Sequence, residues 1–175
     1  MRRETVNAKV TEAQCTGCGA CTNVCPVSAI SMKTDREGFL YPSVEEVQCI
    51  ECGKCLMTCP VLVDNNSNVP TPEIWAVRAS DDLRAVSSSG GVFTVLAEYI
   101  LEEKGIVCGA AYDTEMNVHH ILVEKKEDLK QLRGSKYVQS NVGDVYQKIF
   151  KELKKGRSVL FTGTPCQNAA LRNIV

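Results

Sequence analysis

The stretch that decides the fold is CTGCGACTNVCP, residues 15–26, which recurs as CIECGKCLMTCP at residues 49–60. Each copy has the spacing C-x2-C-x2-C-x3-C-P, and every cysteine of one copy has a counterpart in the other. Three thiolates within seven residues surround one corner of an iron–sulfur cube. The fourth cysteine, before the proline, is directed away from that corner and in a paired arrangement ligates the other cluster.

The repeat therefore predicts two [4Fe-4S] clusters that exchange one ligand. We call the four cysteines predicted for one cluster the first cysteine set: Cys15, Cys18, Cys21 and Cys59. Those predicted for its partner are the second cysteine set: Cys49, Cys52, Cys55 and Cys25. Structural zinc is the alternative, but zinc sites commonly use two C-x2-C pairs with a longer spacer and no third cysteine. Residues 1–62 thus resemble a bacterial-type two-cluster ferredoxin domain, with a short hairpin from residues 30–33 and 38–41.

The composition agrees with a folded protein outside the secretory route. The chain has 175 residues, of which 44% are hydrophobic and 23% charged, and its formal net charge is -1. This charge gives no reason to expect a nucleic acid or an anionic membrane as partner. The N-terminus lacks the apolar run of a signal peptide, and no segment is apolar for long enough to span a bilayer. We expect a cytoplasmic protein, in which ten cysteines indicate metal or redox chemistry rather than disulfides.

The second half of the chain has a different pattern. VDNNSNVPTPE, residues 63–73, is polar and rich in asparagine and proline, which predicts a linker. Apolar periodicity beyond it predicts strands at 74–79, 106–112, 118–124 and 158–162, and helices at 92–104, 127–132, 142–155 and from Pro165. The predicted fold class is α+β: a two-[4Fe-4S] ferredoxin domain over 1–62, then an incomplete α/β domain over 74–175.

Several residues of this half have two interpretations. The loop Ser87–Gly91 precedes a helix and suits a phosphate, but an ordinary serine cap is slightly favoured. His119 and His120 are neighbours on a strand, so they face opposite sides and are interpreted as structural. Cys108 is interpreted as a buried apolar residue. Cys166 begins a helix, where it is a nucleophile, an extra cluster ligand, a proton donor near a cofactor, or a residue without chemistry.

Four segments carry a resemblance to a known family. They are SSSGGVFTVLAEYIL, VCGAAYD, LRGSKYVQS and VLFTGTPCQNAALRN, in this order after the two cysteine runs. Together they resemble the family of coenzyme F420 hydrogenase/dehydrogenase beta subunits, whose members include flavin-binding proteins. The resemblance implies an iron–sulfur flavoprotein with FAD. It implies that Cys166, the candidate catalytic residue, belongs to the flavin site, and it implies the following flavin contacts: Ser88, Ser89, Gly90, Gly91, Ser135, Lys136, Tyr137, Gly163 and Thr164.

The resemblance also implies a function and its alternatives. Electrons would pass between two clusters and the FAD, with a redox partner protein or a small donor or acceptor such as a deazaflavin, in the cytoplasm of an anaerobe. Family members continue beyond TGTPCQ, so this chain resembles the N-terminal part of an oxidoreductase, with the flavin bound here or only in a longer chain. The alternatives are a ferredoxin-like carrier with a docking domain and a non-catalytic remnant.

Overall fold

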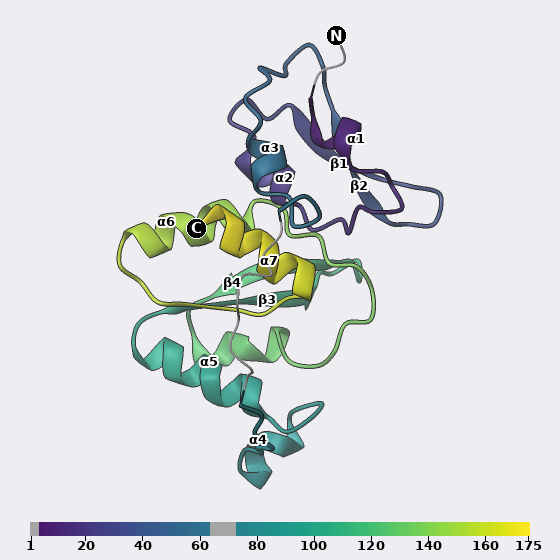
Figure 1. Cartoon of the computed structure of the whole chain (residues 1–175). Coiled ribbons are helices and arrows are strands. Elements are labelled where there is room, and N and C mark those ends of the chain that lie inside the picture. The colour runs from purple at the N-terminus through teal and green to yellow at the C-terminus, as the bar shows by residue number, and fades with distance from the viewer. Residues whose placement is uncertain (1–3, 64–72) are drawn as a thin grey trace. The chain divides into compact units, whose positions relative to one another are not determined.

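The computed structural model describes residues 4–63 and 73–175, so that most of the predicted linker lies outside the described residues (Figure 1). The chain forms two compact units, each described by itself. Unit 1 takes the described part of Met1–Ser67 together with Asn141–Phe150 and Gly163–Val175. Unit 2 takes the described part of Asn68–Ser140 together with Lys151–Thr162. The predicted boundaries, 1–62, 63–73 and 74–175, stay predictions.

The first 63 residues of unit 1 repeat one local structure. Helices α2 (Ala20–Val24) and α3 (Lys54–Met57) each start after a glycine, Gly19 or Gly53, with a left-handed φ of 73° or 71°. A side chain is strained in that conformation, which explains the glycine at the same place in both cysteine runs. The short helix α1 (Val6–Lys9) adds Val6 to a small core that contains Cys21 and Cys59.

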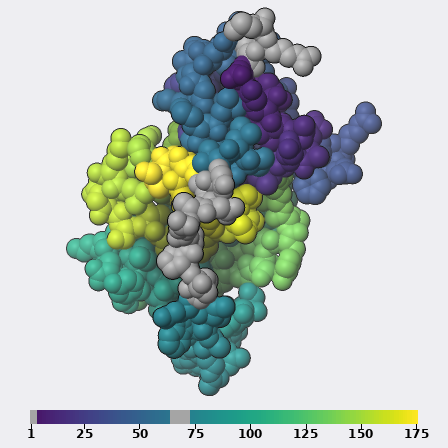
Figure 2. Space-filling view, in the orientation of Figure 1, coloured from purple at the N-terminus to yellow at the C-terminus, as the bar shows by residue number. Residues whose placement is uncertain are grey.

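The predicted hairpin between the two runs is confirmed. Strand β1 (Ile30–Thr34) pairs antiparallel with β2 (Leu40–Val44), with Ile30 opposite Val44. Asp35 closes the turn, because its Oδ1 accepts hydrogen bonds from the N–H groups of Glu37 and Phe39, both at 2.9 Å. The tip of this hairpin projects at the right of the space-filling view (Figure 2).

Unit 2 is built on a three-stranded sheet in the order β4-β3-β5. Strand β3 (Ile106–Tyr112) lies in the centre, antiparallel to β4 (Val118–Val123) and parallel to β5 (Val159–Phe161). Helix α5 (Val92–Glu102) packs on one face of this sheet (Figure 1). The core residues contributed by these elements and by the 3-10 helix η1 (Lys126–Gln131) are Ala97, Val107, Ala111, Val123 and Leu129.

Two further helices contribute to the units. Helix α6 (Val145–Lys154) starts three residues later than predicted, since Gly143 has a positive φ of 51°. Helix α7 (Pro165–Ile174) starts at the predicted proline. Its first turn is fixed by a capping box, in which Thr164 and Gln167 bond each other's backbone N–H groups. No helix within the described ranges is long and apolar enough to span a bilayer.

One predicted element is wrong. Residues 74–79 form no strand, and the large side chains of Ile74, Trp75 and Val77 are exposed. The apolar pattern misleads there because a strand needs a partner: the sheet of unit 2 consists of β4, β3 and β5, and the N–H of Ala79 donates instead to the carbonyl of Gly90 at 2.7 Å. A short helix, α4 (Asp81–Ala85), was not expected. The fold is mixed α/β with small sheets, and its ferredoxin-type and α/β domain arrangement stays a prediction.

A close backbone approach in the sheet of unit 2 gives a stability prediction. A Cβ on Gly109 would lie 2.7 Å from Thr162 Oγ1, which itself donates to the carbonyl of Cys108. Gly109→Ala should therefore lower the free energy of unfolding in urea by about 1–3 kcal/mol, the usual cost of overpacking. Thr162→Ala removes the obstructing atom, so the double variant should be more stable than the sum of the two single effects predicts. Strict additivity would contradict this close approach.

Candidate iron–sulfur and cofactor sites

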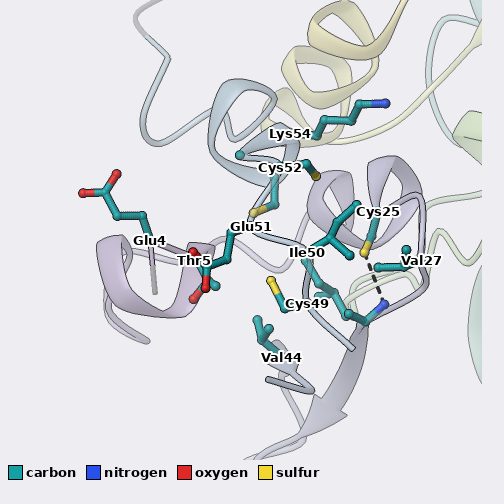
Figure 3. Close-up of a pocket in the computed structure, with 14 residues that line it drawn as sticks. Glu4, Thr5, Cys25, Val27, Val44, Cys49, Ile50, Glu51, Cys52 and Lys54 are labelled. Atoms are coloured by element: carbon teal, nitrogen blue, oxygen red, sulfur yellow. Dashed lines mark hydrogen bonds between the residues drawn. The ribbon is translucent and has the colours of Figure 1, made fainter. Parts of the chain in front are cut away.

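The second cysteine set lines one hollow in unit 1 (Figure 3). This hollow of about 380 Å³ is lined by Cys25, Cys49, Cys52 and Cys55. Cys25 comes from the first run and the other three from the second. The N–H of Ala29 donates to Cys25 Sγ at 3.2 Å, which fixes the direction of that thiol. The remaining wall is largely apolar, with side chains such as Val27, Val44 and Ile50.

The first cysteine set lines a separate hollow of about 320 Å³. Its sulfur-bearing residues are Cys15, Cys18, Cys21 and Cys59, so that again the fourth cysteine comes from the other run. All eight cysteines are free thiols. Over residues 4–63 and 73–175, no group of three or more histidine, cysteine or acidic side chains has the arrangement of ligands for a single metal ion. Four thiols around an apolar hollow are a suitable donor set for a [4Fe-4S] cluster.

Burial makes these thiols poor acids. The pKa of Cys21 is raised to about 12, first by burial and then by the charges of Cys18 and Cys15. Burial is also the largest cause of the raised pKa of Cys15, of Cys18 and of Cys55. Several thiolates side by side in an apolar wall therefore need a cationic centre to offset their charge, as metal binding provides.

Residues far away in the sequence enclose the first cysteine set. Tyr146 on α6 is fully buried, and its hydroxyl group lies 3.0 Å from the carbonyl oxygen of Cys18 and 3.3 Å from that of Gln167. Its O–H group therefore links the first cysteine run to α7. At the other end of α7, Asn173 Nδ2 donates to the carbonyl of Thr58, the residue before Cys59.

Asn23, between Cys21 and Cys25, makes a second link, which connects the first cysteine run with residues 141–150. Its Nδ2 donates to the carbonyls of Gly19 and Gly143 at 2.9 and 2.7 Å. In return, Gln147 Nε2 donates to the carbonyl of Asn23 at 2.7 Å. A Cβ on Gly19 would collide with the side chain of Val142. This link could not be predicted from the sequence, because neither Asn23 nor Tyr146 belongs to a recognisable motif.

Cys166 lies in unit 1, in the first turn of α7. It is half-buried, and Thr164 Oγ1 lies 3.1 Å from its Sγ. Its negative charge is among the lesser causes that raise the pKa of Cys15 and of Cys18, which places it near the first cysteine set. It is not among the residues that line the hollow of that set.

A larger hollow of about 890 Å³ lies in unit 2. Five predicted flavin contacts line it: Ser88, Ser89, Gly90, Gly91 and Ser135. The other four do not. Lys136 Nζ donates to the carbonyls of Gln131 and Arg133, Tyr137 is 92% exposed, and Gly163 and Thr164 belong to unit 1. Lining residues that the sequence analysis missed are Val77, Phe93, Leu132, Arg133 and Thr162.

The polar wall of this hollow suits an anionic group. Helix α5 is capped by Gly91, with a positive φ of 80°, so the alternative of a serine cap is wrong; Ser87 instead donates to the carbonyl of Leu83. The start of α5 therefore leaves backbone N–H groups at the wall, where a phosphate is favoured. Arg133 is held beside them, since its Nε donates to Thr94 Oγ1 at 3.2 Å.

His120 contacts Thr162, one of the residues that line the hollow. Its Nε2 lies 3.1 Å from the carbonyl oxygen of Thr162, which can only accept, so Nε2 carries the proton and donates. Nδ1 then accepts from the hydroxyl of Ser140 at 2.8 Å. Burial lowers the pKa of His120, which favours this neutral form, and its ring stacks on Phe161. These contacts agree with the interpretation of His120 as a structural residue. Cys108 is fully buried, as predicted.

The comparisons with known proteins match two successive segments of the chain. Residues 14–63 match the 4Fe-4S dicluster domain, so the chain contains an iron–sulfur domain over these residues. Residues 74–147 match the N-terminal domain of the coenzyme F420 hydrogenase/dehydrogenase beta subunit. This match and the relative below support the resemblance of the second part of the chain to these beta subunits. It is 28% identical over 171 residues to a component of the F(420)H(2) dehydrogenase of Methanosarcina mazei, covering 91% of this chain but 48% of that protein. It thus spans about half the length of this relative.

The link made by Tyr146 can be tested by removing one oxygen atom. Tyr146→Phe keeps the ring in its buried place but leaves two carbonyl groups without this donor. We expect a loss of about 1–2 kcal/mol in the free energy of unfolding, measured by chemical denaturation under anaerobic conditions. Tyr99→Phe is the matched control, because Tyr99 is 61% exposed and its variant should unfold like the unchanged protein. Equal stability of both variants would contradict a stabilising role for the Tyr146 hydroxyl.

Proposed function

We propose that this chain is an electron-transfer protein that holds two [4Fe-4S] clusters and, in unit 2, an FAD. The observation that carries the proposal is the exchange of Cys25 and Cys59: each lines the hollow of the other run's first three cysteines. A zinc site gives no reason for such an exchange, whereas two neighbouring cubes do. When bound, each cluster accepts and releases one electron.

The residues of the chain supply position and charge for these groups. The first cysteine set would hold one cluster and the second set the other. Burial excludes water from Cys21 and Cys59, and the link through Tyr146 fixes the backbone of Cys18. Rigid ligands need little rearrangement when an electron arrives, which is the property that an electron carrier requires.

The hollow of unit 2 is the proposed FAD site. One part of its wall, formed by the Ser87–Gly91 loop, the start of α5 and Arg133, suits the diphosphate of FAD. The apolar lining at Phe93 and Leu132 suits an aromatic ring of the cofactor. The relative's name refers to reduced F420, and we propose a reduced deazaflavin as the electron donor of this chain. An FAD held by these residues would supply chemistry that couples two-electron to one-electron transfer.

Cys166 is proposed to act beside the first cysteine set without being a ligand of either cluster. It lies in the first turn of α7 in unit 1, and its charge is among the lesser causes that raise the pKa of Cys15 and of Cys18. The two cysteine sets already supply the eight thiolates that two cubes need, so a ninth ligand is surplus. Thr164 is the hydrogen-bond partner of Cys166 in this role.

Iron analysis tests the two cysteine sets. After anaerobic reconstitution the unchanged chain should hold about eight irons. Cys25→Ser should remove the second cluster and Cys59→Ser the first, so that each variant holds about four, with different remaining electron paramagnetic resonance signals. Cys166→Ala is the matched control and should keep about eight. One zinc per run without visible absorbance would refute the cluster proposal, and a loss of four irons in Cys166→Ala would make Cys166 a ligand.

Flavin titration tests the site in unit 2. The reconstituted chain should bind FAD with quenching of flavin fluorescence. Arg133→Ala should weaken this binding about tenfold or more, because a hydrogen bond to a charged group contributes about 1.5–3 kcal/mol. Lys130→Ala is the control, since Lys130 is exposed and does not line the hollow. Absence of FAD binding at full iron content would favour a carrier without flavin.

A further inference from the structure

The two cysteine sets differ in their access to solvent. In the first set Cys21 and Cys59 are buried, and α6 and α7 contribute hydrogen bonds around it. In the second set no cysteine is buried, and Cys52 is exposed. Electron transfer between proteins needs a short distance between the two redox centres. A cluster on the second set would therefore be the one that a partner protein reaches.

Exposed apolar side chains lie close to this cysteine in the sequence. Ile50, which lines the hollow of the second set, is 60% exposed (Figure 3). On either side of it in the sequence, Val47 is 91% exposed and Met57 is 65% exposed. Three large exposed apolar residues within eleven residues of chain, one of them at the hollow of the second set, are a feature of interaction sites. Their segment forms part of the blue surface at the top of Figure 2.

The charged residues close to these apolar side chains in the sequence are mainly acidic. Glu45 and Glu46 directly precede Val47 and are exposed, and Glu51 is exposed between Ile50 and Cys52. The N–H of Cys49 donates to the carbonyl of Glu45, which keeps Glu45 one turn away from the second set. The basic residue within the same run is Lys54. An apolar centre with a charged rim is the usual composition of a protein interface.

We propose that Glu45, Glu46, Val47, Ile50 and Met57, here called the second-cluster face, dock a one-electron redox protein with a basic rim around an apolar contact. The proposal rests on the proposed function, because it needs a cluster on the second cysteine set. One electron passes: the reduced cluster loses it and the partner's redox centre gains it, with no proton and no bond changed. The acidic rim steers the basic partner and the apolar centre holds it briefly.

The experiment uses the full reconstituted chain and a mitochondrial-type cytochrome c, a basic one-electron acceptor, as probe. The chain is reduced with dithionite, the excess is removed, and haem reduction is followed by stopped flow. The second-order rate constant should fall at least tenfold between low and high salt, because salt screens exposed charges. A neutral benzoquinone is the second acceptor, and its reduction should not depend on salt.

Charge and contact are tested by separate variants. Glu45→Lys/Glu46→Lys should slow cytochrome c reduction at least fivefold at low salt and leave benzoquinone reduction unchanged. Glu103→Lys/Glu127→Lys is the matched control, with the same change in net charge at exposed positions of unit 2, and should have a far smaller effect. Val47→Ser should slow the reaction at high salt as well, since it removes an apolar contact rather than a charge.

The outcomes separate this proposal from the proposed function. Iron content and absorbance show first whether the clusters are present; without them the proposed function fails. With full clusters, three results would overturn the second-cluster face: equal loss in both double variants, an equal loss with benzoquinone, or faster reduction of an acidic flavodoxin than of cytochrome c. A rate of cytochrome c reduction that does not change with salt would also overturn the second-cluster face.

Discussion

The two cysteine runs are crossed in space, and this crossing constrains the whole of the first 63 residues. The last cysteine of each run, Cys25 or Cys59, lies in the hollow of the other run. For both to do so, α2 and α3 must pack on each other, and the β1–β2 hairpin must span the chain between them. The core around Val6, Cys21 and Cys59 is small. Cluster binding would therefore supply much of its folding free energy, as metal does in other small domains.

This constraint reaches beyond the cysteine runs. Tyr146 and Asn23 connect the first run with residues from 141–150 and with α7, so the compact unit is assembled from three separate stretches of sequence. A chain that leaves unit 1, builds unit 2 and returns twice is costly in loop-closure entropy, and buried hydrogen bonds have to offset that cost. As a result, two cysteines of the first set, Cys21 and Cys59, are buried, and α6 and α7 make hydrogen bonds beside Cys18 and Cys59.

Local patterns in the sequence predicted much of this structure. The cysteine spacing, the Asp35 hairpin and the helix start at Thr164-Pro165 depend on residues close in sequence, so they could be predicted. The strand expected at 74–79 was wrong because its alternation shows only that apolar side chains need cover, and no strand of the sheet pairs with it. Asn23, Tyr146, Phe93 and Arg133 were missed for the opposite reason. Their partners are far away in sequence, and each residue type is common in ordinary surfaces and cores.

Under the proposed function, the different surroundings of the two cysteine sets suit different roles. A hydrogen-bonded enclosure, as around Cys18, lowers the motion and the solvation of a bound group, which favours fast electron exchange inside one protein. An exposed edge, as at Cys52, is solvated and accessible, which suits a brief encounter with another protein. The sequence repeat is symmetric, but the later segments contact its two halves unequally. Because Tyr146 and Asn173 bond beside Cys18 and Cys59, residues outside the repeat make the surroundings of the two cysteine sets unequal.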